Sequence, residues 1–89
     1  MVIYNENGIS IVNNGKALQV RFDMDQILVN ENAWSVYKTI SAYHRDEKYA
    51  RHIKGGYSFR PNDNFESLDA LVREFKAVLA IVNKNTVLF

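Results

Sequence analysis

The chain has 89 residues, of which 47% are hydrophobic and 24% are charged, so it is long enough for one globular domain and too short for two independent cores. It contains no cysteine, which excludes disulfides, thiolate metal ligands and a cysteine nucleophile. The net charge is only +1, but residues 38–60 carry six basic and two acidic side chains, and the segments on either side are each acidic overall.

No stretch of the sequence approaches the roughly 18–20 consecutive apolar residues that cross a bilayer. The first residues lack the basic region and the continuous apolar region of a secretory signal. We therefore expect no membrane association and a cytoplasmic location, with which a cysteine-free chain is compatible.

Two Asn-Gly dipeptides, at residues 7–8 and 14–15, have the sequence preference of tight hairpin turns, whose central residues take positive φ. They separate three runs rich in strand-forming residues, at 2–5, 9–13 and 17–23. In the third run apolar residues alternate with polar ones, which is typical of a half-buried strand. The sequence predicts a three-stranded antiparallel meander.

Residues 24–29 form a connector whose apolar end, Ile27-Leu28-Val29, could add a short strand. Asn30 or Asn32 is a suitable N-cap for a helix that follows. Apolar side chains at helical spacing favour a helix over residues 33–43, while the same stretch is also rich in residues that prefer strands. Helix is the preferred prediction, and strand is the alternative.

The last third of the chain begins with Gly55-Gly56, which ends the preceding element, and a short strand is predicted over residues 57–60. Asp63 and Glu66 have the spacing of a capping box, and apolar residues then recur in three- and four-residue steps. This pattern predicts a long helix over residues 64–83, and the apolar tail 86–89 is expected to dock as a strand or a plug.

These elements make a single α+β domain covering residues 1–89. The predicted architecture is a three-stranded antiparallel meander plus a short later strand, packed against two helices. The C-terminal helix is the longer of the two and is amphipathic.

Little in the sequence points to catalysis. His44 and His52 are too far apart on a helix to share one metal ion, and no nucleotide-binding or hydrolase motif is present. Asp23 and Asp25 could place two carboxylates on one face of a strand, as a Mg²⁺-dependent nuclease requires, but acidic residues at the end of an edge strand also serve solubility. We predict that the protein is not an enzyme and uses no cofactor or metal.

The most informative segment is the basic centre, which interleaves cations with tyrosines. Cations displace the counterions of phosphates, aromatic rings stack on unpaired bases, and a Gly pair lets backbone approach a phosphate closely. The segment predicts contacts with nucleic acid, or with an acidic protein of a nucleoprotein complex. The alternative is that these charges only solvate the surface. The predicted contact residues are Arg45, Lys48, Tyr49, Arg51, Lys54, Tyr57 and Arg60.

A second functional hypothesis is a protein-interaction module, such as a small phage-type inhibitor of a host factor. Its interface would be the open face of the sheet or a spare face of the last helix. The residues predicted for the sheet face are Ser10, Val12, Gln19 and Arg21.

Every residue from Ala77 to Val82 is apolar, so the last helix is apolar on all sides at this point. One small sheet covers one side of a helix. The remaining side predicts either a homodimer through the C-terminal helix or cover by the first helix and the tail.

Overall fold

Five strands form one antiparallel sheet with the strand order β1-β2-β3-β5-β4. The computed structural model describes residues 1–44, 50–63 and 65–87. Along the chain the elements are β1 (Val2–Glu6), β2 (Ile9–Asn13), β3 (Leu18–Phe22), α1 (Met24–Ile27), α2 (Glu31–His44), β4 (Ala50–Ile53), β5 (Gly56–Phe59) and α3 (Leu68–Val87). The α+β class and the N-terminal meander are confirmed.

The turns of the meander form where the two Asn-Gly dipeptides predicted them. Asn7 and Gly8 both have positive φ, 53° and 92°, as a tight hairpin turn requires. In the second turn Gly15 has φ 89°, and the side-chain oxygen of Asn14 accepts a hydrogen bond of 2.9 Å from the backbone N–H of Ala17. These local bonds fix the register in which Ile11 of β2 lies opposite Val20 of β3.

The sequence predicted one later strand, and the structure contains two. β4 and β5 form a hairpin around Lys54 and Gly55, and Gly55 takes φ 79°. β5 pairs with β3 on its other side, so the hairpin extends the meander rather than standing apart from it. The predicted boundary at the Gly pair is therefore a turn within a hairpin.

The connector after β3 is helical and not extended. The carboxylate of Asp23 accepts a hydrogen bond from the backbone N–H of Asp25 and caps α1, whose Ile27 is fully buried. Helix α2 then confirms the helical prediction for residues 33–43. Of the two candidate caps, Asn30 is the one used, because its side-chain oxygen accepts from the backbone N–H of Ala33 at 3.0 Å.

Asn30→Ala is expected to lower the free energy of unfolding by about 1 kcal/mol, because the first turn of α2 loses its cap. Asn32→Ala is the matched control. The Asn32 side-chain oxygen is buried without a hydrogen-bond partner, so its removal is expected to cost much less or to stabilise the fold. Urea unfolding of both variants measures the difference, and equal losses would contradict the assignment of Asn30 as the cap.

The last helix begins later than the capping box predicted. Residues 62 and 65 form an isolated bridge, and the backbone N–H of Phe65 donates to the carbonyl of Asn62 at 3.1 Å, which places Asp63 and Glu66 before the helix. The Ser67 hydroxyl accepts from the backbone N–H of Ala70 and starts α3. The helix runs to Val87, so residues 86 and 87 are helical rather than a strand or a plug, and residues 88–89 lie outside the described part.

Among the described residues, no helix combines the length and apolar character needed to cross a membrane.

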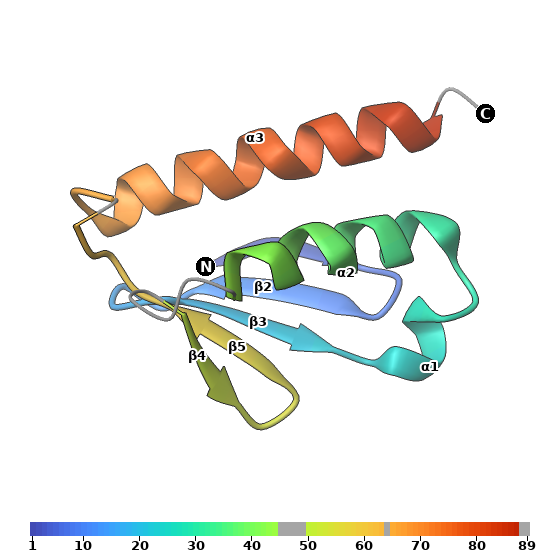
Figure 1. Cartoon of the computed structure of the whole chain (residues 1–89), viewed down its shortest axis with the longest axis horizontal. Coiled ribbons are helices and arrows are strands. Elements are labelled where there is room, and N and C mark those ends of the chain that lie inside the picture. Colours follow the sequence, from blue (N-terminus) through green and yellow to red (C-terminus); the bar gives the residue numbers. More distant parts are fainter. Residues whose placement is uncertain (45–49, 64, 88–89) are drawn as a thin grey trace.

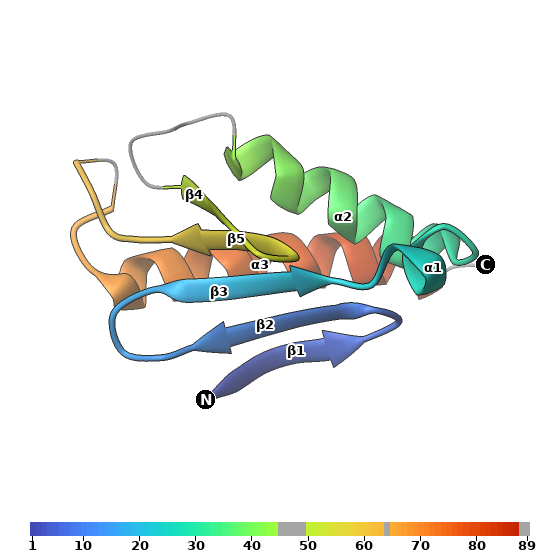
Figure 2. The same cartoon turned by 90° about the horizontal axis from the view of Figure 1, so that it is seen from below.

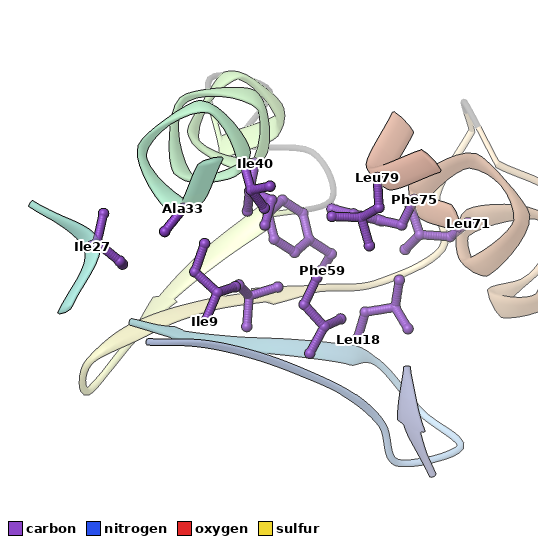
Figure 3. Close-up of a cluster of buried hydrophobic side chains, with 12 residues drawn as sticks. Ile9, Leu18, Ile27, Ala33, Ile40, Phe59, Leu71, Phe75 and Leu79 are labelled. Carbon is purple, nitrogen blue, oxygen red and sulfur yellow. The ribbon is translucent and has the colours of Figure 1, made fainter. Parts of the chain in front are cut away.

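Both long helices lie on one face of the sheet (Figure 1). The core forms between these layers, where Ile9, Leu18 and Phe59 of the sheet face Ile40 of α2 and the buried apolar side of α3 (Figure 3). Figure 2 looks onto the opposite face of the sheet, which neither of the two long helices covers. The strands therefore bury one set of alternating side chains and present the other set to solvent.

Candidate functional site

The side of the sheet that faces away from the helices is called here the uncovered face. It combines two arginines with hydroxyl and amide side chains, and no aspartate or glutamate belongs to it among the described strands. Its polar members come from all five strands and are related by the register: Asn5, Ser10, Gln19, Arg21, Ser58 and Arg51. Val12 lies in the same layer, opposite Gln19. Val2 lies beside Val12 at the β1 edge, and Asp23, directly after β3, lines a hollow with Asn5, Ser10 and Arg21. The face is therefore mostly polar, with two arginines and one carboxylate at its border.

The sequence hypotheses treated the basic centre and the sheet face as two separate surfaces. The structure joins them, because Ser58 of β5 lies between Gln19 of β3 and Arg51 of β4 in the register. Arg51 is therefore on the same face as Ser10, Val12, Gln19 and Arg21, which had been assigned to the alternative interface.

The tip of the β4–β5 hairpin is tied to the end of β3. Arg21 donates from Nη1 to the carbonyl of Lys54 at 2.8 Å, and the backbone N–H of Phe22 donates to the carbonyl of Gly55 at 2.8 Å. These two bonds hold the turn and place Lys54 next to Arg21. The side chains of Arg21 and Lys54 are both exposed.

The predicted contact residues do not all share one face. Arg51 belongs to the uncovered face, Lys54 lies in the hairpin turn, and Arg60 is exposed directly after β5. Tyr57 lies on the other face of β5, half-buried and next to the core. The remaining three, Arg45, Lys48 and Tyr49, lie outside the described residues.

Tyr57 belongs to a chain of aromatic rings that sequence reasoning did not assemble. Its ring lies 5.6 Å from that of Phe22, nearly perpendicular to it, and Phe22 lies 4.9 Å from Tyr37 at an angle of 77°. Trp34, which is 39% exposed, stacks on Tyr37 with centroids 5.3 Å apart. The one available signal was the three-residue spacing of Trp34 and Tyr37, which puts both on one side of a helix.

These rings border an open hollow of about 260 Å³ between α2 and the β4–β5 hairpin. We call it the aromatic hollow. It is lined by Phe22, Met24, Tyr37, His52, Ile53, Gly55, Gly56 and Tyr57. Its rim includes the same turn whose Lys54 lies beside Arg21, so aromatic surface and positive charge meet at the hairpin tip.

Exposed apolar side chains gather near α1. Leu28 is 65% exposed and Val29 is 85% exposed, and the partly exposed Met24 and Trp34 lie close to them in sequence. Four of the six large apolar side chains described as exposed belong to this stretch of eleven residues. Leu28 and Val29, which are adjacent in the chain, make this stretch a candidate contact surface for another molecule.

The acidic and histidine candidates have structural roles where they are described. The Asp23 carboxylate accepts from the backbone N–H of Asp25 at 3.2 Å and from the side-chain amide of Gln26 at 2.9 Å, so it serves as a helix cap. The ring of His52 packs 5.1 Å from that of Tyr57. Within the described ranges, no group of three or more potential ligands is arranged to hold a metal ion.

The glycine pair has an internal role. A Cβ atom on Gly56 would overlap the carbonyl oxygen of Val20, so β3 and β5 pair as closely as they do only because this residue is glycine. Gly55 has open space around it and positive φ. The backbone at Gly56 is thus enclosed by the sheet, and the Gly55 carbonyl is bonded to the backbone N–H of Phe22, while no atom lies near the position of a Cβ on Gly55.

Helix α3 leaves small apolar residues exposed over its middle. Leu79 is buried, while Ala77 and Ala80 face solvent. α2 packs alongside α3 and covers part of it. A homodimer through α3 stays a prediction, and the molecular mass in solution checks it.

No protein-family model matches the chain, and no curated protein or solved structure matches it significantly.

Proposed function

We propose that the protein is a non-catalytic module that binds single-stranded nucleic acid along the uncovered face and over the tip of the β4–β5 hairpin. The observation that supports this most is the position of Arg21, Arg51 and Lys54. Arg21 and Arg51 share the uncovered face, and exposed Lys54 lies in the turn whose carbonyl Arg21 bonds. No acidic side chain of the described strands shares this face, and Asp23, directly after β3, borders it beside Arg21.

The physical argument rests on the charge of the phosphate backbone. Each cation that contacts a phosphate releases a condensed counterion, which favours binding independently of sequence. Gln19, Ser10 and Ser58 add amide and hydroxyl groups between the cations, and such groups are common partners of phosphate and sugar oxygens.

Arg51→Glu is expected to weaken binding of a fluorescently labelled single-stranded oligonucleotide about tenfold at about 0.1 M salt, because it replaces a phosphate contact with a repulsion. Fluorescence anisotropy measures the dissociation constant. Lys76→Glu is the matched control: it changes the net charge equally, at an exposed position of α3 on the other layer of the molecule.

The control variant is expected to change the affinity less than about twofold, because salt at about 0.1 M largely screens exposed charges that are more than about 10 Å apart. Equal losses in both variants would show that only the net charge matters and would remove the uncovered face from the account. Absence of binding by the unmodified protein would remove the proposed function itself.

A second candidate function is a protein-interaction module, and the exposed apolar side chains near α1 favour it. Leu28 and Val29 leave most of their apolar side-chain surface in contact with water, and binding to a partner protein would remove that contact. The two functions separate in a pull-down from nuclease-treated lysate. A protein retained by the unmodified chain and by Arg51→Glu, but lost with Val29→Lys, supports the second candidate.

A further inference from the structure

A second hollow, which we call the polar hollow, opens on the uncovered face and is lined from β1, β2, β3 and α1. It has a volume of about 280 Å³. Sites that enclose a whole small ligand measure roughly 300–1,000 Å³, so this hollow fits one part of a larger molecule. Its polar lining residues are Asn5, Ser10, Arg21, Asp23 and Gln26, and Gly8 and Phe22 complete it.

The lining is held in place by its own hydrogen bonds. The backbone N–H of Asp23 donates to the carbonyl of Gly8 at 2.7 Å, and the side-chain amide of Gln26 donates to the Asp23 carboxylate at 2.9 Å. On the neighbouring strands, the Ser10 hydroxyl donates to the side-chain oxygen of Asn5 at 3.3 Å. The polar groups are therefore largely positioned before a ligand enters, which lowers the cost of binding.

The two charged members of the lining have more hydrogen-bonding capacity than these bonds use. A guanidinium carries five N–H groups, and Arg21 donates from Nη1 to the carbonyl of Lys54 at 2.8 Å. An ionised carboxylate accepts about four hydrogen bonds, and Asp23 accepts from the Asp25 backbone and from Gln26. The carboxylate repels a bare anion, and an apolar group would desolvate both charges without compensation. The fitting ligand is an anionic group with a hydrogen-bond donor close to it.

The spacing of the two charges suits a ribose and its own phosphate. Asp23 has an extended backbone, with φ −107° and ψ 100°, so it follows Arg21 by two extended residues on the same face, roughly 6–7 Å away. In RNA each phosphate is joined to a ribose that carries a 2′-hydroxyl, and carboxylates accept hydrogen bonds from ribose hydroxyls in nucleotide sites. DNA offers the phosphate without that donor.

We propose that the polar hollow receives one ribose of the bound strand, with its phosphate on Arg21 and its 2′-hydroxyl donating to Asp23, so that the protein prefers RNA to DNA. This inference rests on the proposed function and deepens it by naming the chemistry of the strand. The cations of the uncovered face attract either nucleic acid through its phosphates. The hollow adds a contact that only a ribose can make.

The experiment compares three labelled strands of equal length by fluorescence anisotropy with the full chain at about 0.1 M salt. They are oligouridine, oligodeoxyuridine and 2′-O-methyl oligouridine, which share their base and their phosphates. The methylated strand keeps the 2′-oxygen and loses its hydrogen. Oligouridine is expected to bind about tenfold more tightly than either of the others, which is the effect of one hydrogen bond to a charged acceptor.

Asp23→Asn is expected to abolish the preference for oligouridine. Asparagine also caps helices, so the side-chain bond to the backbone N–H of Asp25 can be kept while the charged acceptor is lost. Asp25→Asn is the matched control, because it removes the same charge from an exposed residue that does not line the hollow. Both variants are expected to bind all strands slightly more tightly, and only the control is expected to keep the ratio between oligouridine and oligodeoxyuridine.

The outcomes separate the two proposals. Equal affinity of the unmodified protein for all three strands overturns the ribose site and leaves the phosphate-binding face intact. Oligouridine and its methylated form binding equally well, and both better than oligodeoxyuridine, also overturns it, because the preference then follows sugar conformation. A preference that survives Asp23→Asn overturns Asp23 as the acceptor. Binding of none of the strands overturns both proposals. If Asp23→Asn fails to fold, the three strands on the unmodified protein still decide the question.

Discussion

Gly56→Ala is expected to lower the free energy of unfolding by about 3 kcal/mol. The alanine Cβ would overlap the carbonyl oxygen of Val20, and the Cα of Arg21 would lie only 3.0 Å from it. Backbone atoms paired in a sheet cannot move aside as a flexible side chain does. The β3–β5 pairing must therefore open at this end, and with it the attachment of the β4–β5 hairpin.

Urea unfolding of Gly56→Ala should be read beside Gly55→Ala, a variant of the adjacent residue in the same turn. Gly55 has φ 79° and nothing within contact distance of an added Cβ, so alanine there costs only the strain of the left-handed conformation, about 1 kcal/mol. Similar losses in the two variants would contradict the claim that close strand approach, rather than turn geometry, requires Gly56.

Phe59→Ala is expected to cost about 4 kcal/mol, which is a large part of the stability of a domain of this size. Phe59 is fully buried and lies on β5 between β3 and β4. Its ring contacts Phe75 of α3 with centroids 5.0 Å apart, so it joins the sheet to the helix layer (Figure 3). Truncation leaves a cavity where the two layers meet.

Phe59→Leu is the control, because it keeps most of the buried volume and loses only the ring contacts. We expect it to cost less than about 2 kcal/mol. Thermal or urea unfolding of the two variants measures the difference. A leucine variant as unstable as the alanine variant would mean that ring geometry, and not filled volume, holds the layers together.

The N-terminal half of the fold was predictable because its determinants are local. Asn7-Gly8 and Asn14-Gly15 fix two turns through backbone preferences of adjacent residues, and alternation along β3 fixes which side chains are buried. The helical pattern of α2 prevailed over its strand-forming composition. The helix buries Val36 and Ile40 on the same side, and this burial in the core outweighs the strand preference of the residue types.

The β4–β5 hairpin was not predicted, because β4 is short and its sequence, Ala-Arg-His-Ile, has no apolar alternation. The strand conformation of β4 depends on its hydrogen bonds to β5, and β5 in turn pairs with β3, which lies more than thirty residues away in the chain. The start of α3 was misplaced for a similar reason. Asp63 and Glu66 fit a capping box, but the bridge between residues 62 and 65 uses that backbone for a turn.

The candidate site was predictable in its residues and not in its arrangement. Composition identified the cations and Tyr57, and alternation identified the polar face of the meander. Only the β3–β5 register shows that Arg51 and Arg21 share a face and that Tyr57 points away from it. The aromatic hollow unites residues from β3, α2 and the hairpin, and no single segment of the sequence carries its pattern.

The central claim is that cations of the uncovered face and hairpin tip bind phosphates, and the salt dependence of binding tests it most directly. The measurement is the dissociation constant of the unmodified protein for a single-stranded oligonucleotide at several salt concentrations. Contacts from Arg21, Arg51 and Lys54 predict that the logarithm of the association constant falls linearly with the logarithm of salt, with a slope of about −2. A slope near zero would contradict the account.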